Sequence, residues 1–167
     1  LIRAQQLMAR LFPDDKIVQL TRIVILRLLS LTPSDLQMWE NAPEELIQED
    51  ITDFSDFRIS AAADLLWRKL LRYKPELVGR EVISTLKACI AECARPADQV
   101  PMEAILRKDA CYNAIASGYN LLSGIIDIRD LFVNVITPDM KNPDPRYGIV
   151  ISQGFTYRPS TPIRSVQ

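Results

Sequence analysis

The sequence predicts an all-α protein, an α-solenoid of HEAT-like antiparallel helix pairs. Apolar residues recur three or four positions apart along most of the chain, which is the spacing of one helix face. Prolines stand where helices would begin, and the 167 residues include only 5 glycines. Two segments, 56–95 and 101–137, each have the length of one helix pair of about 40 residues, which is typical of HEAT or armadillo repeats. A closed bundle would contain the same helices, but proline-started pairs of this size favour the solenoid.

The first helix is expected from Asp14 to Leu31. Asp14 and Asp15 would lie near the positive end of its dipole, where negative charge is favourable. Polar residues interrupt its apolar face, and no segment reaches the ~18–20 uninterrupted apolar residues of a membrane span. We therefore expect no membrane insertion, and the start at Leu1 suggests a fragment rather than a signal peptide. The apolar face comprises Ile17, Val18, Leu20, Ile23, Val24, Leu28 and Leu31.

A short helix is predicted next. Thr32 and Pro33 fit an N-cap and the first helical position, and Asp35 follows three residues after the cap. Trp39 is expected to anchor this helix on the rest of the fold, and an exposed binding hot spot is the alternative. Pro43 would begin a further helix.

Two long helices are predicted on either side of Lys74–Pro75, because the residue before a proline is pushed out of helical geometry. The first covers residues 56–73, and Pro75 begins the second, which ends near Arg95–Pro96. The apolar faces consist of Ile59, Ala62, Ala63, Leu66, Trp67, Leu70 and Leu71 in the first helix and of Val78, Val82, Leu86, Cys89, Ile90 and Cys93 in the second.

Two further helices complete the helical part. Pro101 would open a helix that runs to Leu122, and Asp127 would cap a last helix that ends at Thr137–Pro138. Small residues in the first of these helices would let a neighbouring helix approach closely: Ala110, Ala114, Ala116 and Gly118.

The chain is expected to divide into a helical repeat segment at 1–141 and an irregular proline-rich tail at 142–167. Residues 32–56 would form an acidic connector within the helical segment. Prolines and glycines break any helix after Pro143, so an extended tail is expected, with a docking peptide as the alternative.

The three cysteines are expected to be structural. Cys89 and Cys93 lie on one helix face among apolar residues, and Cys111 follows in a later helix. Free cysteine packs as a small apolar residue. A metal site or a regulatory thiol is the alternative, but no partner histidine or CxxC motif accompanies them.

Composition argues against an enzyme. There is no histidine, the net charge is −1, and no phosphate-loop, nucleophile-elbow or HExxH motif occurs. Balanced charge gives no reason to expect nucleic-acid binding, and no cofactor is expected. The adjacent pairs Lys108–Asp109 and Arg129–Asp130 would point apart on a helix rather than pair with each other, as residues on helix ridges.

The sharpest charge feature is an acidic stretch from Asp35 to Asp56 that contains no lysine or arginine. Nothing apolar encloses these acids to shift their pKa values, so acid–base catalysis is disfavoured. A solvated loop and a surface that meets a basic partner are both compatible with the pattern. The candidate partner-binding residues are Glu44, Glu45, Glu49 and Asp50.

Three stretches resemble segments of the importin-β (karyopherin-β) superfamily, closest to its importin-eleven branch. The first is LTPSDLQMWENAPEELIQED at 31–50, the second is FRISAAADLLWRKLLRYKPEL at 57–77, and the third is LRKDACYNAIASGYNLL at 106–122. The resemblance extends over residues 31–147. The matching positions are expected to act mainly as fold determinants: Trp39, Pro43, Glu44, Glu45, Lys108, Asp109, Ala110 and Tyr112.

The resemblance implies a HEAT-repeat receptor that binds the small GTPase Ran in its GTP form and carries protein cargo past nucleoporins. Such a receptor is found in the cytoplasm, in the nucleus and at the nuclear envelope or pore. It has no active site of its own, since GTP hydrolysis belongs to Ran. A generic helical-repeat scaffold unrelated to Ran is the alternative, and it would bind its partners regardless of the nucleotide on Ran.

Overall fold

A computed structural model describes residues 10–42 and 59–148 of the chain, and these form helices and turns without a strand. The all-α class predicted from the sequence is confirmed. The longer elements are α2 (Asp14–Ile23), its π-helical continuation η1 (Val24–Leu28), α3 (Pro33–Asn41), α5 (Ile59–Tyr73), α6 (Pro75–Cys93) and α7 (Met102–Ser117). The shorter ones are η3 (Ala97–Gln99), α8 (Tyr119–Leu122), α9 (Ile128–Leu131), the π-helical η4 (Phe132–Ile136), α10 (Thr137–Met140) and η5 (Pro145–Tyr147).

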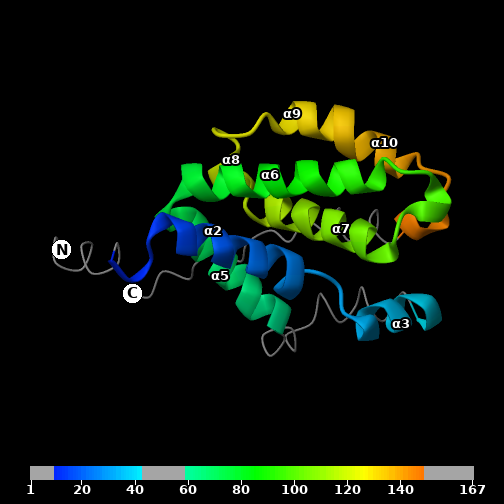
Figure 1. The fold of residues 1–167 in the computed structure, drawn as a ribbon, viewed down its shortest axis with the longest axis horizontal. Helices are drawn as coiled ribbons and strands as arrows, with labels where there is room; N and C mark the ends of the chain where they lie inside the picture. The colour runs from blue at the N-terminus through cyan, green and yellow to red at the C-terminus, as the bar shows by residue number, and fades with distance from the viewer. Residues whose placement is uncertain (1–9, 43–58, 149–167) are drawn as a thin grey trace, which may run out of the picture.

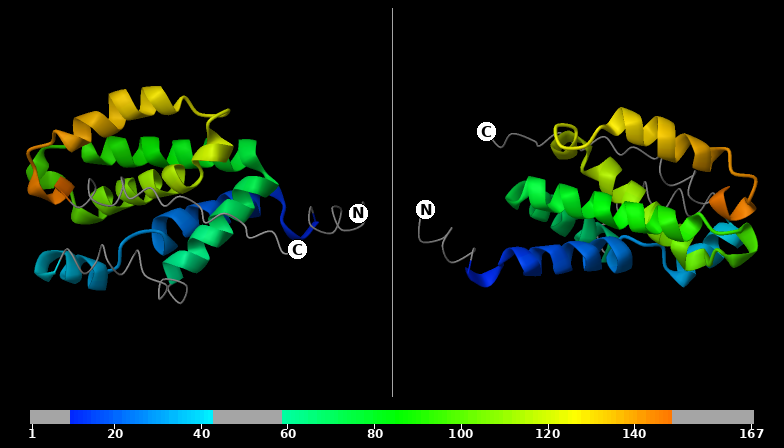
Figure 2. Two further views of the ribbon diagram at one scale, coloured as in Figure 1. Left: turned by 180° about the vertical axis from the view of Figure 1, so that it is seen from behind. Right: turned by 45° about the horizontal axis from the view of Figure 1, so that its top comes forward.

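The helices alternate in direction along the chain. In Figures 1 and 2, α2, α6 and the α9–η4–α10 stretch run in one sense, and α5 and α7 run in the other. The most extensive contacts join α6 to α7 and α2 to α6, and α5 packs against η1, α6 and α7. Successive antiparallel helices that pack on their neighbours are the local arrangement required by stacked helix pairs.

Trp67 is the largest fully buried side chain, and it ties α5 to α7. Its indole Nε1 donates a hydrogen bond to the backbone carbonyl of Ala114 at 2.8 Å. This bond satisfies the only polar group of a side chain that is otherwise surrounded by apolar atoms. Sequence periodicity placed Trp67 on the buried face of its helix, and this is confirmed.

The helix that begins after Pro101 ends earlier than predicted. α7 stops at Ser117, Gly118 is its C-cap, and α8 starts at Tyr119. A Cβ at position 118 would lie 2.8 Å from Cδ2 of Leu71, so the absent side chain lets α5 approach closely. The predicted close approach at Gly118 is confirmed, but the same residue also interrupts the helix.

The predicted helix starts at Thr32 and Asp127 are confirmed. The Thr32 hydroxyl accepts from the Asp35 amide at 3.2 Å, and the Asp35 carboxylate accepts from the Thr32 amide at 2.7 Å, which is a capping box. The Asp127 carboxylate accepts from the Asp130 amide at 2.9 Å. Trp39 is half-buried and packs against the core, so it anchors α3 as predicted.

The prediction that the last helix ends at Thr137–Pro138 was wrong. The helix passes through the wider π turn η4 and continues as α10 to Met140. Proline lacks an N–H and its ring clashes with the carbonyl four residues back, and a wider turn relieves this clash. The Thr137 hydroxyl also donates to the Phe132 carbonyl at 2.9 Å.

The N-terminal helical stretch is more apolar than the sequence analysis implied. Taken together, Asp14–Asn41 is long and apolar enough to cross a membrane by length and composition, and it is the one such stretch among the described residues. This is weak evidence for a membrane helix, because core helices of soluble proteins and signal sequences meet the same criteria. In this fold, Ile17, Val24 and Ile25 of the stretch are fully buried in the core.

Candidate functional site

The predicted partner-binding loop lies outside the described residues. Its four acids, Glu44, Glu45, Glu49 and Asp50, fall within 43–58, together with the helix start predicted at Pro43. Their role therefore stays a prediction. The described residues instead contain a buried polar cluster at the C-terminal end of the fold and a pocket beside α6.

The polar cluster joins α7 to α10 and consists of Lys108, Tyr112 and Asp139; we call it the clamp. The Lys108 ammonium lies 2.6 Å from one carboxylate oxygen of Asp139 and donates to the other at 2.7 Å. The Tyr112 hydroxyl donates to the same carboxylate at 2.6 Å. All three residues are buried, and burial together with this hydrogen bond raises the pKa of Tyr112. A buried ion pair with both partners hydrogen-bonded fixes the relative position of two helices.

Both residues of the adjacent pair Lys108–Asp109, predicted to lie on a helix ridge, are buried, with exposed fractions of 4% and 0%. Lys108 is buried because its partner, Asp139, arrives from a helix 31 residues further along the chain. Arg129 and Asp130, the other adjacent pair, are exposed.

Asp109 is a buried carboxyl group without an ionic partner among the described residues. One oxygen has no hydrogen-bond partner, and the other accepts from the Asn113 amide at 3.4 Å. Burial raises the pKa of Asp109 to about 8. This side chain is therefore largely neutral at physiological pH.

The start of the predicted tail packs against the helices. Tyr147 is buried, and its ring centroid lies 5.6 Å from the Lys108 ammonium, which is a cation–π contact. Arg146 donates to the backbone carbonyls of Val100 and Ala97 at 2.6 and 2.7 Å and pairs with Asp144 at 2.6 Å. Residues 142–148 are irregular apart from η5, and the division into a helical segment and a tail stays a prediction. Residues 149–167 lie outside the described ranges.

The cysteines pack in the protein interior, as predicted. Cys89 and Cys111 are buried, Cys93 is half-buried, and all three are free thiols. A hydrogen bond to Cys111 lowers the pKa of Cys89, while the same bond and burial raise the pKa of Cys111. Within the part of the chain that the structure describes, no group of three potential ligands could hold a metal ion.

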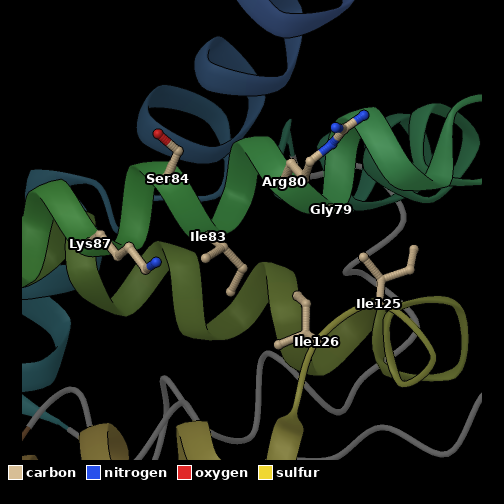
Figure 3. A pocket seen from close by; sticks show the side chains of 7 residues that line it. All are labelled: Gly79, Arg80, Ile83, Ser84, Lys87, Ile125 and Ile126. Carbon is tan, nitrogen blue, oxygen red and sulfur yellow. The ribbon is translucent and has the colours of Figure 1, made fainter.

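A pocket of about 360 Å³ lies between α6 and the loop that precedes α9; we call it the α6 pocket. In Figure 3, Ile83 points from α6 toward Ile126, and the amine of Lys87 lies on the same side of the helix. Arg80 and Ser84 point to the other side of α6 in this view. The lining comprises Gly79, Arg80, Ile83, Ser84, Lys87, Ile125 and Ile126.

The two sites have different characters. In the clamp, each polar group meets another polar group of the same protein, so the clamp holds helices in place. The α6 pocket combines an apolar floor with exposed polar side chains, which is the composition of a binding site. Sequence reasoning missed both, since the residues of each come from segments that are distant in the sequence.

Comparison with known proteins finds a distant relative. The chain is 25% identical over 114 residues to the importin beta-like protein KAP120 of Saccharomyces cerevisiae, and the match covers 68% of this chain. The chain spans 11% of the length of that relative. No family model matches, and no solved structure matches. The match supports the importin-β superfamily that the sequence resembles.

Proposed function

We propose that this chain is a segment of a nuclear transport receptor closest to the importin-eleven branch, which binds protein cargo and the GTP form of Ran. The observation that carries the proposal is the similarity of 114 residues to an importin beta-like protein, in a chain whose described residues form helices and turns without a strand. The alternating helices and the clamp support it further, because a stack of helix pairs needs firm contacts between successive helices.

In mechanism, such a receptor couples two binding events. Stacked helix pairs form an extended surface on which Ran-GTP and cargo influence each other's affinity through a coupling free energy. In an importin, Ran-GTP would displace cargo, and in an exportin it would stabilise cargo binding. The coupling is reciprocal, so cargo changes the affinity for Ran-GTP by the same factor.

The acidic loop is the candidate contact with a basic partner, either cargo or Ran. Glu44, Glu45, Glu49 and Asp50 supply four negative charges in seven residues of sequence. Reversal of these four charges to lysine is expected to weaken binding of basic partners and to reduce its salt dependence. Unchanged affinity for every basic partner tested would show that the loop makes no such contact.

Transport function also implies passage through the nuclear pore. We infer contacts with nucleoporins and a distribution between cytoplasm, nucleus and the nuclear envelope. Imaging of the fluorescently tagged protein in living cells is expected to show signal in both compartments with enrichment at the nuclear rim.

A pull-down from extract of the source organism tests the proposal. Ran is immobilised with GTP in one arm and with GDP in the other, and an antibody against residues 56–137 detects the bound protein. Retention only by the GTP form, in a band much larger than 19.0 kDa, is the expected result. Binding that is indifferent to the nucleotide would favour a generic helical-repeat scaffold instead.

A further inference from the structure

The last helical stretch, which comprises α9, η4 and α10 from Ile128 to Met140, is packed less firmly than the helices before it; we call it the arm. In the arm only Leu131 and Asp139 are buried, whereas α7 buries ten of its 16 residues. The arm runs along α6 in Figures 1 and 2, yet its close contacts with α6 and α7 are few compared with those between α6 and α7 themselves. Elements with few buried side chains open at a low cost in free energy.

The two buried residues lie near opposite ends of the arm. Leu131 joins the apolar core close to the start of the arm, and Asp139 is the acceptor of the clamp at its far end. The clamp contacts from Lys108 and Tyr112 to this carboxylate are 2.6–2.7 Å long. Such contacts weaken steeply with distance, so the clamp is either formed or lost as a whole.

A hinge lies just before α9. The side chain of Ile125 packs against Gly79 of α6, where an added Cβ would lie 3.2 Å from it, so residue 125 stays attached to α6. Asp127 is the N-cap of α9 and has an extended backbone, with φ −72° and ψ 91°. Ile126 and Asp127 thus connect a turn that is held on α6 to the arm without belonging to a helix. Hinges typically consist of a few such residues at the end of an element.

We propose that the arm is a hinged element that turns about Ile126–Asp127 and leaves α6 and α7 as one unit when the clamp opens. The clamp is the latch of the closed state, because it is the farther of the two buried contacts from the hinge. Opening uncovers the half-buried side of the arm, which carries Ile128, Val135 and Ile136. This inference goes beyond the proposed transport function and does not depend on binding of Ran.

Hydrogen exchange of the full-length protein tests whether the arm opens as a unit. Asp139→Ala breaks the clamp and is expected to speed exchange by about 100-fold or more in peptides from both halves of the arm, 128–134 and 135–141. The matched control is Asp130→Ala, which removes an exposed carboxylate of the same arm and is expected to leave exchange within about threefold. Unchanged exchange in α6 and α7 shows that the variants are folded.

A milder variant keeps the test valid if Asp139→Ala does not fold. Tyr112→Phe removes one of the two donors to Asp139 and leaves the ion pair with Lys108. Loss of a hydrogen bond to a charged group is expected to speed exchange by about tenfold, again in both halves of the arm.

Distances between spin labels, measured by double electron–electron resonance, test whether the arm turns. The labels are attached to ketone-bearing residues, so that the native thiols stay unmodified. The far pair replaces the exposed residues Lys141 and Ala91, and the near pair replaces the exposed residues Arg129 and Arg80. A turn of about 30° moves the end of an arm of about 20 Å by about 10 Å. In Asp139→Ala we expect a second, longer distance for the far pair and a much smaller change for the near pair.

Any of the following results would overturn the proposal. Faster exchange confined to 135–141 would mean that the end of the arm frays by itself. An unchanged distance for the far pair, or an equal change for both pairs, would mean that the arm does not turn about Ile126–Asp127. A response of Asp130→Ala as large as that of Asp139→Ala would mean that the clamp is not the latch.

Discussion

Replacement of Asp139 by alanine is expected to destabilise the contact between α7 and α10. The variant would leave the ammonium of Lys108 and the hydroxyl of Tyr112 without their shared acceptor. The Lys108 side chain is 6% exposed and the Asp139 side chain is 11% exposed, so water cannot easily replace the lost carboxylate. The perturbation therefore strands a buried charge rather than removing a surface contact.

The size of the stability loss expected for Asp139→Ala follows from this burial. Breaking a buried pair by removing one partner costs about 3–5 kcal/mol, whereas an exposed pair is worth about 0–1 kcal/mol. Replacing both partners by apolar residues of similar size is often neutral or stabilising. Asp139→Ala is thus expected to lower the local stability of α10 by about 3 kcal/mol, and Lys108→Met with Asp139→Leu is expected to recover most of the loss.

Hydrogen exchange followed by mass spectrometry measures this loss of local stability in peptides that cover α10 and residues 142–148. A loss of about 3 kcal/mol corresponds to an exchange rate faster by a factor of about 100 or more in those peptides. Arg68→Ala, which removes the more exposed pair with Asp64 within α5, is the matched control and is expected to change exchange little. A change in Asp139→Ala no larger than in this control would refute the reasoning, as would a double variant less stable than the single one.

Three further predictions concern single positions. Gly118→Ala should lower the free energy of unfolding by about 1–2 kcal/mol in urea denaturation, because its Cβ would meet Leu71 at 2.8 Å, while Gly124→Ala, with nothing within 4 Å, should not. Burial raises the pKa of Asp109 to about 8 in the folded state, so the folded state holds this proton more tightly than the unfolded state does. The free energy of unfolding therefore falls as pH rises from about 4 to about 8. Asp109→Asn should therefore flatten the decline in stability between pH 5.5 and pH 8, by up to about 1.4 kcal/mol per pH unit, and an equal slope in both proteins would count against this. Thr32→Ala removes the N-cap of α3 and should cost about 1 kcal/mol, measured as faster hydrogen exchange in 33–41; unchanged exchange would contradict the capping role.

The sequence predicted features that depend on local chemistry. Helix starts at Asp14, Pro33, Pro75 and Ile128 followed from caps, prolines and first-turn acids, and each is observed within one or two residues. The buried position of Trp67 followed from helical periodicity. These signals act within a few residues, so one stretch of sequence contains them.

Features that depend on distant partners could not be read in the same way. Lys108 and Asp109 look like exposed helix charges because nothing nearby in the sequence indicates Asp139 or the enclosing core. Pro138 looks like a helix end because no local motif indicates the π turn at Phe132–Ile136 that precedes it. Arg146 lies in a proline-rich segment, yet its bonds to Ala97 and Val100 span more than 40 residues. The α6 pocket likewise requires Ile125 and Ile126 to lie beside α6.

Equilibrium binding of the purified full-length protein to Ran tests the proposed transport function most directly. Ran loaded with a non-hydrolysable GTP analogue and Ran loaded with GDP are titrated under identical salt and magnesium, and the two dissociation constants are compared. We expect the GTP form to bind at least about 100-fold more tightly, a difference of about 2.7 kcal/mol. Equal affinity for the two forms, or no binding of either, would contradict the assignment to Ran-dependent nuclear transport.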